Sequence, residues 1–165
     1  MSNIVVQKFG GTSLADTDRF KAVAKIIKDT SNEGKKVVAV VSAMAGETQR
    51  LIDLAKEVQD IPDPREYDAL ISSGEQVSVA LLALTLRNEK VKSKSYTAFQ
   101  LGLKTDDFHG KARINSIDTK NILRDISADI TPVITGFQGI NEEGDITTLG
   151  RGGSDTSAVA LAVAL

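Results

Sequence analysis

The stretch VVQKFGGTSLADTDRF, residues Val5–Phe20, decides what kind of sheet this chain builds. The β-branched run Ile4–Phe9 predicts a buried strand, and the two glycines after it predict a tight turn. Asp16–Asp29 then carries apolar residues at helical spacing, and Val37–Val41 is a second, all-apolar strand. Two buried strands joined by a helix form a βαβ unit. We therefore expect an α/β fold with a parallel sheet and a right-handed crossover.

The rest of the chain alternates between helical and strand-like spacing. No repeat or linker divides it, and 165 residues are enough for one domain with a core. The expected helices are Thr48–Val58, Glu66–Leu86 with an interruption near Ser72–Gly74, Ile117–Ile126 and Ser154–Leu165; the expected strands are Lys94–Phe99, Pro132–Phe137 and Asp145–Leu149; and a hairpin is expected within Leu101–Ile114.

Composition excludes several classes of function. Hydrophobic residues make up 41% and charged residues 25%, which is typical of a soluble globular protein. The net charge of −2 and the 4% of aromatic residues argue against nucleic-acid binding. The chain has no cysteine and no secretory signal, and its longest apolar run, Ala158–Leu165, is far shorter than the roughly 20 residues of a membrane span. We expect a cytoplasmic protein that binds neither nucleic acid nor membranes.

The motif KFGGTS combines a lysine at a strand end with two glycines. Gly10 and Gly11 allow close backbone approach, and successive N–H groups can form an anion-binding nest. Lys8 stands before the glycines, where it could reach over the same anion as a point charge. The alternative is a plain turn beside a solvated lysine, and this motif alone does not decide between the two.

Two further motifs carry charge next to glycine. In LGRGGSD, Arg151 offers a planar fork for a carboxylate or phosphate at the start of a helix, whose N-terminus adds partial positive charge. In SSGEQVS, Glu75 lies in an apolar helical stretch, where it is either on the wet face or held for a purpose. The alternatives are a glycine-rich turn with a polar cap and a solvated glutamate.

Polar residues also follow the second strand, in VVSAMAGET. Ligands of open α/β sheets bind at the carboxyl ends of strands, so Ser42 and Thr48 are candidates, although Thr48 could simply cap the next helix. Asp106, Asp107 and His109 in TDDFHGKAR could suggest a metal site. One histidine and two adjacent acids are more often a solvated loop, and we expect no metal site there.

Taken together, the motifs resemble those of aspartokinases. VVQKFGGTS, VVSAMAG, SSGEQVS, HGKARI, GFQG and TTLGRGGSDTSAVALA follow in the order found in the N-terminal part of that family, over essentially the whole chain. KFGGTS and GRGGSD together distinguish it from acetylglutamate, glutamate and uridylate kinases. The resemblance implies a three-layer α/β/α sandwich with a mainly parallel central sheet, in truncated form. It also implies transfer of the ATP γ-phosphoryl group to the side chain of L-aspartate, the first step of lysine, methionine and threonine synthesis.

The resemblance also implies a role for each matched residue. Lys8 would hold the ATP phosphates, and Asp155 would organise the cationic groups around them. Glu75 would meet the aspartate ammonium group and Arg151 the α-carboxylate. The other implied residues are Phe9, Gly10, Gly11, Ser13 and Ser42 for ATP, and Thr48, Phe137, Gly152, Gly153 and Ser154 for aspartate. Mg²⁺ would accompany ATP, and no metal site made by the protein alone is implied.

The same resemblance sets an expectation for what lies outside residues 1–165. Aspartokinases continue with a segment that binds the nucleotide base and with regulatory ACT domains. We therefore expect a fragment that is inactive alone, with an apolar face at Val159, Leu161, Val163 and Leu165 that favours a homo-oligomer. Two alternatives remain: another amino acid kinase, or a non-catalytic module that binds an acidic ligand.

Overall fold

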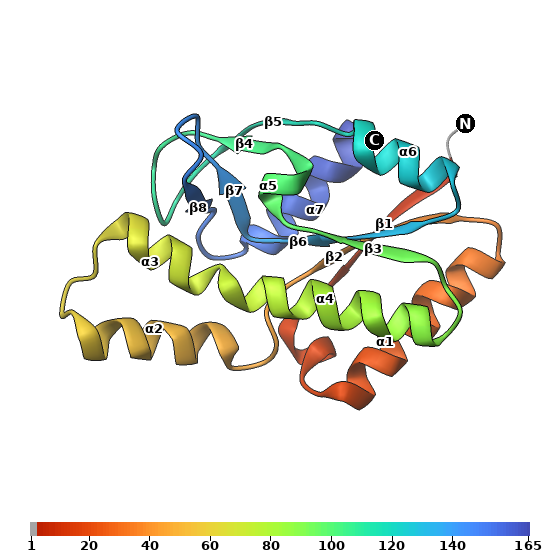
Figure 1. The fold of residues 1–165 in the computed structure, drawn as a ribbon, viewed down its shortest axis with the longest axis horizontal. Helices are drawn as coiled ribbons and strands as arrows, with labels where there is room; N and C mark the ends of the chain where they lie inside the picture. Colours follow the sequence, from red (N-terminus) through yellow and green to blue (C-terminus); the bar gives the residue numbers. More distant parts are fainter. Residues whose placement is uncertain (1–2) are drawn as a thin grey trace.

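The computed structural model describes residues 3–165, in which helices cover both faces of a central sheet (Figure 1). The sheet contains four strands in the order β1-β2-β6-β3, and every neighbouring pair is parallel. Its strands are β1 (Ile4–Phe9), β2 (Lys36–Val41), β3 (Ser93–Tyr96) and β6 (Thr131–Thr135). The expected parallel sheet is confirmed. β1 was expected to be fully buried, but it is an edge strand and most of its residues are half-buried.

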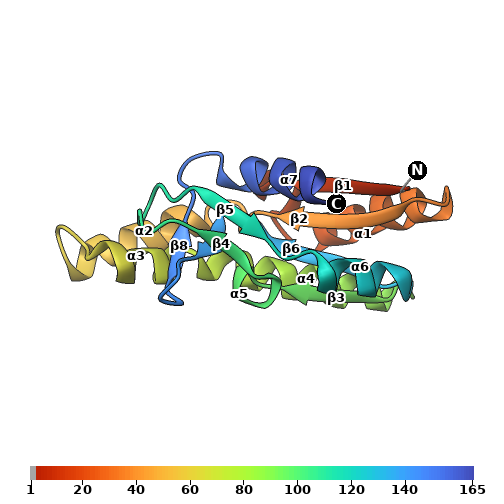
Figure 2. The ribbon, with the colours of Figure 1, turned by 90° about the horizontal axis from the view of Figure 1, so that it is seen from above.

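The helices divide into two layers, which Figures 1 and 2 show from two directions. One face carries α1 (Thr17–Asn32) and α4 (Ser73–Asn88); the other carries α5 (Ala98–Leu101), α6 (Lys120–Ser127) and α7 (Gly153–Ala164). Successive side chains of β2 point to opposite faces, so Val37 packs with the first layer and Val38 with the second. Because both faces are covered, β2 is apolar at every position after Lys36. The three-layer α/β/α sandwich is confirmed.

A second, smaller sheet lies beside the first and was not expected. Its strands are β4 (Leu103–Thr105), β5 (Ile114–Ile117), β7 (Gln138–Ile140) and β8 (Ile146–Thr148), in the order β5-β4-β7-β8. β4 and β5 pair antiparallel, which confirms the hairpin expected in this region. The remaining elements are the short 3-10 helix η1 (Gly11–Leu14) and helices α2 (Glu47–Val58) and α3 (Pro64–Ile71). α3 packs against β8, so the second sheet contacts a helix from the first half of the sequence.

Two expected element boundaries are wrong. The strand expected at Lys94–Phe99 ends at Tyr96, because Thr97 begins α5 in a capping box with Gln100. Ile117 belongs to β5, and the helix expected from that residue begins only at Lys120. In both cases a local hydrogen-bonding or pairing partner outweighs the apolar spacing.

The helical run Pro64–Asn88 joins α3 and α4 at Ser72, within the interruption expected there. Its 25 residues are long and apolar enough to cross a membrane by length and composition, and half of its most apolar window is buried inside the protein. Ala158–Leu165 remains the longest uninterrupted apolar run, because polar residues divide the apolar residues of Pro64–Asn88. A core helix of a globular protein meets the same criteria, so the finding is weak support for a membrane span.

Candidate active site

A cavity of about 300 Å³ lies where the carboxyl ends of β1, β2 and β6 meet the start of α7. Ligands of open α/β sheets bind at these carboxyl ends of the strands. Its lining residues are Lys8, Ser42, Thr48, Glu75, Phe137, Gly150, Arg151, Gly152, Gly153, Ser154 and Asp155. Every one of them except Gly150 was a candidate from the sequence. The structure therefore brings together residues from five separate motifs.

Lys8 and Asp155 meet across this cavity. The Lys8 Nζ atom lies 2.9 Å from Asp155 Oδ1, and 29% of the Lys8 side chain remains exposed. Lys8 comes from β1, whereas Asp155 lies in the first turn of α7, where the helix carries partial positive charge. The ion pair holds the lysine ammonium group over the helix N-terminus. Two sources of positive charge therefore face the same space.

Glu75 is the buried charge of the site. Only 2% of the residue is exposed, so the alternative of a solvated glutamate is wrong. The backbone N–H of Ala43 donates to Oε1 at 3.0 Å, but Oε2 has no hydrogen-bond partner among the described residues. Burial raises the pKa of this carboxyl group to about 7, despite the backbone hydrogen bonds that lower it. A buried carboxylate oxygen without a partner is costly, and a cationic ligand would satisfy it.

Arg151 lies on a glycine loop that enters α7. Gly150 and Gly152 adopt left-handed backbone conformations, with φ of 78° and 77°, which only glycine adopts without strain. Gly152 is the N-cap of α7, so the turn places Arg151 directly before the helix N-terminus. Among residues 3–165, no carboxylate forms an ion pair with Arg151. Its guanidinium group can therefore bind an anion in the cavity.

Phe137 forms a wall of the cavity in an unusual conformation. Its φ of 70° is left-handed, which is an outlier for a bulky side chain. Its backbone N–H donates to Ser157 Oγ at 3.1 Å, and its carbonyl oxygen accepts from the Leu149 N–H at 2.8 Å. These bonds hold the strained residue between β6 and α7. Such outliers are often found at functional sites.

Four candidates for ATP binding do not line the cavity. Phe9 is buried in the core at 8% exposure, and its carbonyl oxygen accepts from the Ser42 N–H. Gly10 lies beside Lys8, since a Cβ atom there would be 3.4 Å from Nζ. Gly11 lines a neighbouring cavity of about 510 Å³ that shares Ser42 and Thr48 with the first. Ser13 donates its N–H to Gly10 within η1.

Thr48 does not cap a helix. α2 begins at Glu47 with Gly46 as its N-cap, so the capping alternative is wrong and Thr48 lies in the first turn, between the two cavities.

The acidic loop that contains Asp106 and His109 makes local contacts. Asp106 Oδ1 accepts from the N–H groups of Phe108 and Arg113, and His109 contacts Asp68. The described residues contain no group of three or more potential metal-ligating side chains.

Asp68 was missed from the sequence, although it is fully buried. The only signal was an acid on the apolar helix that also carries Glu75. Its partners lie far along the chain, on the loop before β5 and at the end of β8, which spacing cannot reveal.

Comparison with known proteins assigns the chain to a family. The model of the amino acid kinase family matches residues 3–165. This chain belongs to the amino acid kinase family. It is 54% identical over 162 residues to an aspartate kinase of Stutzerimonas stutzeri, covering 98% of this chain and 39% of that protein. The chain therefore spans well under half of the relative's length.

Solved structures of the family agree. The aspartate kinase of Synechocystis matches with a TM-score of 0.81 and 47% identity, over 96% of this chain and 26% of that one. The Escherichia coli aspartokinase III in complex with aspartate and ADP matches with a TM-score of 0.87 and 27% identity, over 98% of this chain and 46% of that one. The amino acid kinase fold of this chain is therefore shared with enzymes that act on aspartate.

Proposed function

We propose that the protein containing this chain transfers the γ-phosphoryl group of ATP to the side-chain carboxylate of L-aspartate. The observation that carries the proposal is one cavity that combines buried Glu75, the Arg151 fork and the Lys8–Asp155 pair. An α-amino acid needs an anion for its ammonium group and a cation for its α-carboxylate. Aspartate kinases with up to 54% identity support the assignment. The product, 4-aspartyl phosphate, would feed lysine, threonine and methionine synthesis.

Glu75 and Arg151 recognise the backbone of the acceptor amino acid in this proposal. The ammonium group binds Glu75 Oε2, which has no hydrogen-bond partner among the described residues. The α-carboxylate takes the planar fork of Arg151. Because the pKa of Glu75 is raised to about 7, the ionised form that binds an ammonium group becomes dominant only above that pH. The KM for aspartate should therefore fall as the pH rises through about 7.

The chemistry requires charge neutralisation rather than proton removal. An oxygen of the aspartate side chain forms a bond to the γ-phosphorus, while the bond from that phosphorus to the ADP oxygen breaks. Free aspartate side chains have a pKa of about 4, so the nucleophile is already ionised and needs no general base. Lys8 and the N-terminus of α7 face the space where two anions must meet. Positioning and electrostatic stabilisation account for most of the rate in phosphoryl transfer.

Mg²⁺ would enter with the nucleotide. The described residues form no cage of three or more ligating side chains, which fits a cation held mainly by ATP phosphates. Asp155 is the exposed carboxylate of the cavity, beside Lys8, and is the side chain best placed to face such a cation. The bound ion would neutralise charge on the phosphates, and Lys8 would add to that effect.

An acceptor panel tests the proposal and its two alternatives. The full-length protein is given ATP and Mg²⁺ with aspartate, glutamate, N-acetylglutamate or UMP, and ADP release is measured together with trapping of the acyl phosphate by hydroxylamine. We expect ADP and a hydroxamate with aspartate only. Turnover with another acceptor would assign a different amino acid kinase. Aspartate binding without ADP release would assign a non-catalytic module.

A further inference from the structure

Asp68 is a fully buried carboxylate that does not line the cavity and accepts three hydrogen bonds. Thr148 donates its N–H to Oδ2 at 3.0 Å and its hydroxyl to Oδ1 at 2.6 Å. The Gly110 N–H donates to Oδ2 at 2.9 Å, and His109 Nδ1 lies 3.0 Å from the same oxygen. Burying a charge is costly unless it is hydrogen-bonded in this way. Such a side chain joins three segments firmly: α3, the loop before β5 and the strand β8.

These contacts join the two elements that carry the acceptor-binding residues. Asp68 and Glu75 belong to the single helical run Pro64–Asn88, about two turns apart. Thr148 ends β8, three residues before Arg151 on the adjoining loop. The Asp68–Thr148 contact therefore connects the helical run that carries Glu75 to the strand that precedes Arg151.

The loop that contains Gly110 lies against the turn that carries Arg151. A Cβ atom on Gly150 would lie 3.0 Å from the Gly110 carbonyl oxygen, so the two segments are in close contact. The Ala112 N–H also donates to the Thr148 carbonyl oxygen at 2.9 Å. Asp68 holds this loop through the Gly110 N–H and His109. Asp68 is thus hydrogen-bonded to both segments next to the turn that carries Arg151, at Gly110 and at Thr148.

A second bond supports the same geometry. The Gln138 side-chain amide donates to the Ser72 carbonyl oxygen at 3.0 Å, at the junction between α3 and α4. Gln138 is buried and directly follows Phe137, the strained wall of the cavity. The helix bearing Glu75 is therefore attached to the small sheet at Ser72 as well as at Asp68.

We propose that Asp68 is a positioning residue, which fixes the distance between Glu75 and Arg151 and thereby sets the affinity for the acceptor amino acid. The inference rests on the proposed function, because it assigns those two residues to the acceptor. An aspartate suits this position because three donors converge on it: the Gly110 N–H, the Thr148 N–H and the Thr148 hydroxyl. It does not touch the substrate, so it should affect acceptor binding and leave ATP binding unchanged.

Asp125 provides a matched control for a general loss of stability. It is also a buried aspartate, 3% exposed, and accepts from Tyr96 Oη at 2.5 Å and from Arg124. It lies on α6 and does not line the cavity. Asp125→Asn should destabilise the protein without altering either substrate affinity.

The experiment uses the full-length protein with Asp68→Asn, Thr148→Val, the double variant and Asp125→Asn. Aspartate affinity is measured by calorimetry and as KM, alongside the KM for ATP and the melting temperature. We expect Asp68→Asn to weaken aspartate affinity about tenfold, with the KM for ATP within about twofold of the wild type. Thr148→Val should weaken it about threefold, and the double variant should resemble Asp68→Asn because both changes break one link.

Three results would overturn the inference: unchanged aspartate affinity in Asp68→Asn, an equal loss for ATP, or an equal effect in Asp125→Asn. If Asp68→Asn does not fold, Thr148→Val decides in the same way, since it keeps the side-chain shape and the backbone bond. The proposed function is judged separately on the wild type. A wild type that binds aspartate without turnover refutes the kinase assignment and leaves the positioning role measurable by calorimetry. A wild type that does not bind aspartate refutes both.

Discussion

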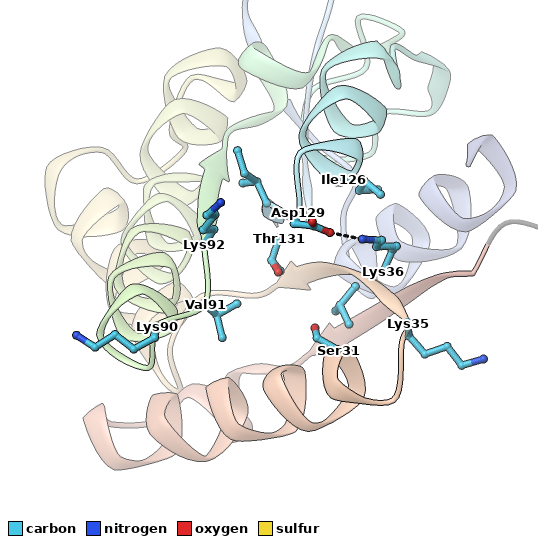
Figure 3. A pocket seen from close by; sticks show the side chains of 11 residues that line it. Ser31, Lys35, Lys36, Lys90, Val91, Lys92, Ile126, Asp129 and Thr131 are labelled. Atoms are coloured by element: carbon cyan, nitrogen blue, oxygen red, sulfur yellow. Dashed lines mark hydrogen bonds and ion pairs between the residues drawn. The ribbon is translucent and has the colours of Figure 1, made fainter.

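Two cavities of nearly equal size lie at opposite ends of the strands of the parallel sheet. The candidate active site, about 300 Å³, is at the carboxyl ends of the strands. The second cavity, about 310 Å³, is at their amino ends (Figure 3). Its lining residues are Ser31, Lys35, Lys36, Val37, Lys90, Val91, Lys92, Ile126, Asp129, Ile130 and Thr131. We call this second cavity the lysine cavity. The two differ in how their charges are arranged.

The lysine cavity carries positive charge that balances the ends of helices. α1, α4 and α6 all end at this edge, where their carbonyl groups carry partial negative charge. Figure 3 shows Lys35 and Lys90 pointing away from the cavity, while Lys36 pairs with Asp129 across it. Lys35 and Lys90 therefore extend away from the cavity, whereas Lys36 forms an exposed ion pair.

The candidate active site shows the opposite arrangement. There α7 begins, Lys8 and Asp155 converge, and a carboxylate is buried with one oxygen lacking a partner among the described residues. Backbone strain does not distinguish the two cavities, since each has residues with left-handed backbone conformations. Lys90 and Asp129 line the lysine cavity, and Phe137 lines the candidate active site. Cavity volume and backbone strain are therefore similar at the two ends of the strands, whereas charged groups converge beside a buried carboxylate only in the candidate active site of the two.

Removing Lys8 should have the largest effect. Under the proposed function, Lys8→Ala in the full-length protein should lower kcat about 100-fold or more, with little change in the KM for aspartate, because Lys8 would face charge that develops in the transition state. Steady-state kinetics measure both constants. Lys92→Ala, a lysine of the other cavity, should leave kcat unchanged. Equal effects of the two variants on kcat would contradict the assignment of catalysis to the cavity that contains Lys8.

Burial of Glu75 should make stability depend on pH. The pKa of this group is about 7 in the folded chain, against 4.5 for a glutamate in water. Between these values the folded state holds a proton that the unfolded state releases, so stability falls as the pH rises from about 4.5 to about 7, by up to about 3 kcal/mol. Chemical unfolding of the wild type and Glu75→Gln across pH 4 to 8 measures the difference. Parallel curves would show that Glu75 is not held in a low-dielectric site.

Arg151→Lys keeps the charge but loses the bidentate fork. The KM for aspartate should rise about tenfold, with the KM for ATP unchanged. Kinetics with each substrate varied in turn measure this. A rise in the KM for ATP alone would mean that the glycine loop before α7 binds the nucleotide and that the two loops are assigned the wrong way round.

Breaking the pair in the lysine cavity should have the smallest effect. Both partners, Lys36 and Asp129, are exposed, so Lys36→Ala should cost less than about 1 kcal/mol of unfolding free energy and leave kcat and both KM values unchanged. Denaturant unfolding and steady-state kinetics measure these quantities. A loss of activity in this variant would show that the amino edge of the sheet also serves function.

Much of the site could be predicted because its residues lie within motifs next to element ends. Lys8 at a strand end, Glu75 in an apolar helix and Arg151 before a helix start are visible in the printed sequence, and the family resemblance assigns their roles. Asp68 could not be found in this way. Its partners His109 and Thr148 are 41 and 80 residues away, beyond the range over which spacing carries information.

The sequence by itself determined the βαβ start, the parallel sheet, the apolar β2 and the residue types of the site, because periodicity and turn chemistry act over a few neighbouring residues. Only the tertiary structure decided that Glu75 is buried and that Lys8 meets Asp155 from the far end of the chain. It also decided that β1 lies at the edge and that a second sheet fixes the helix bearing Glu75. Burial, ion pairing and pKa depend on neighbours brought together by folding, and these neighbours are distant in sequence.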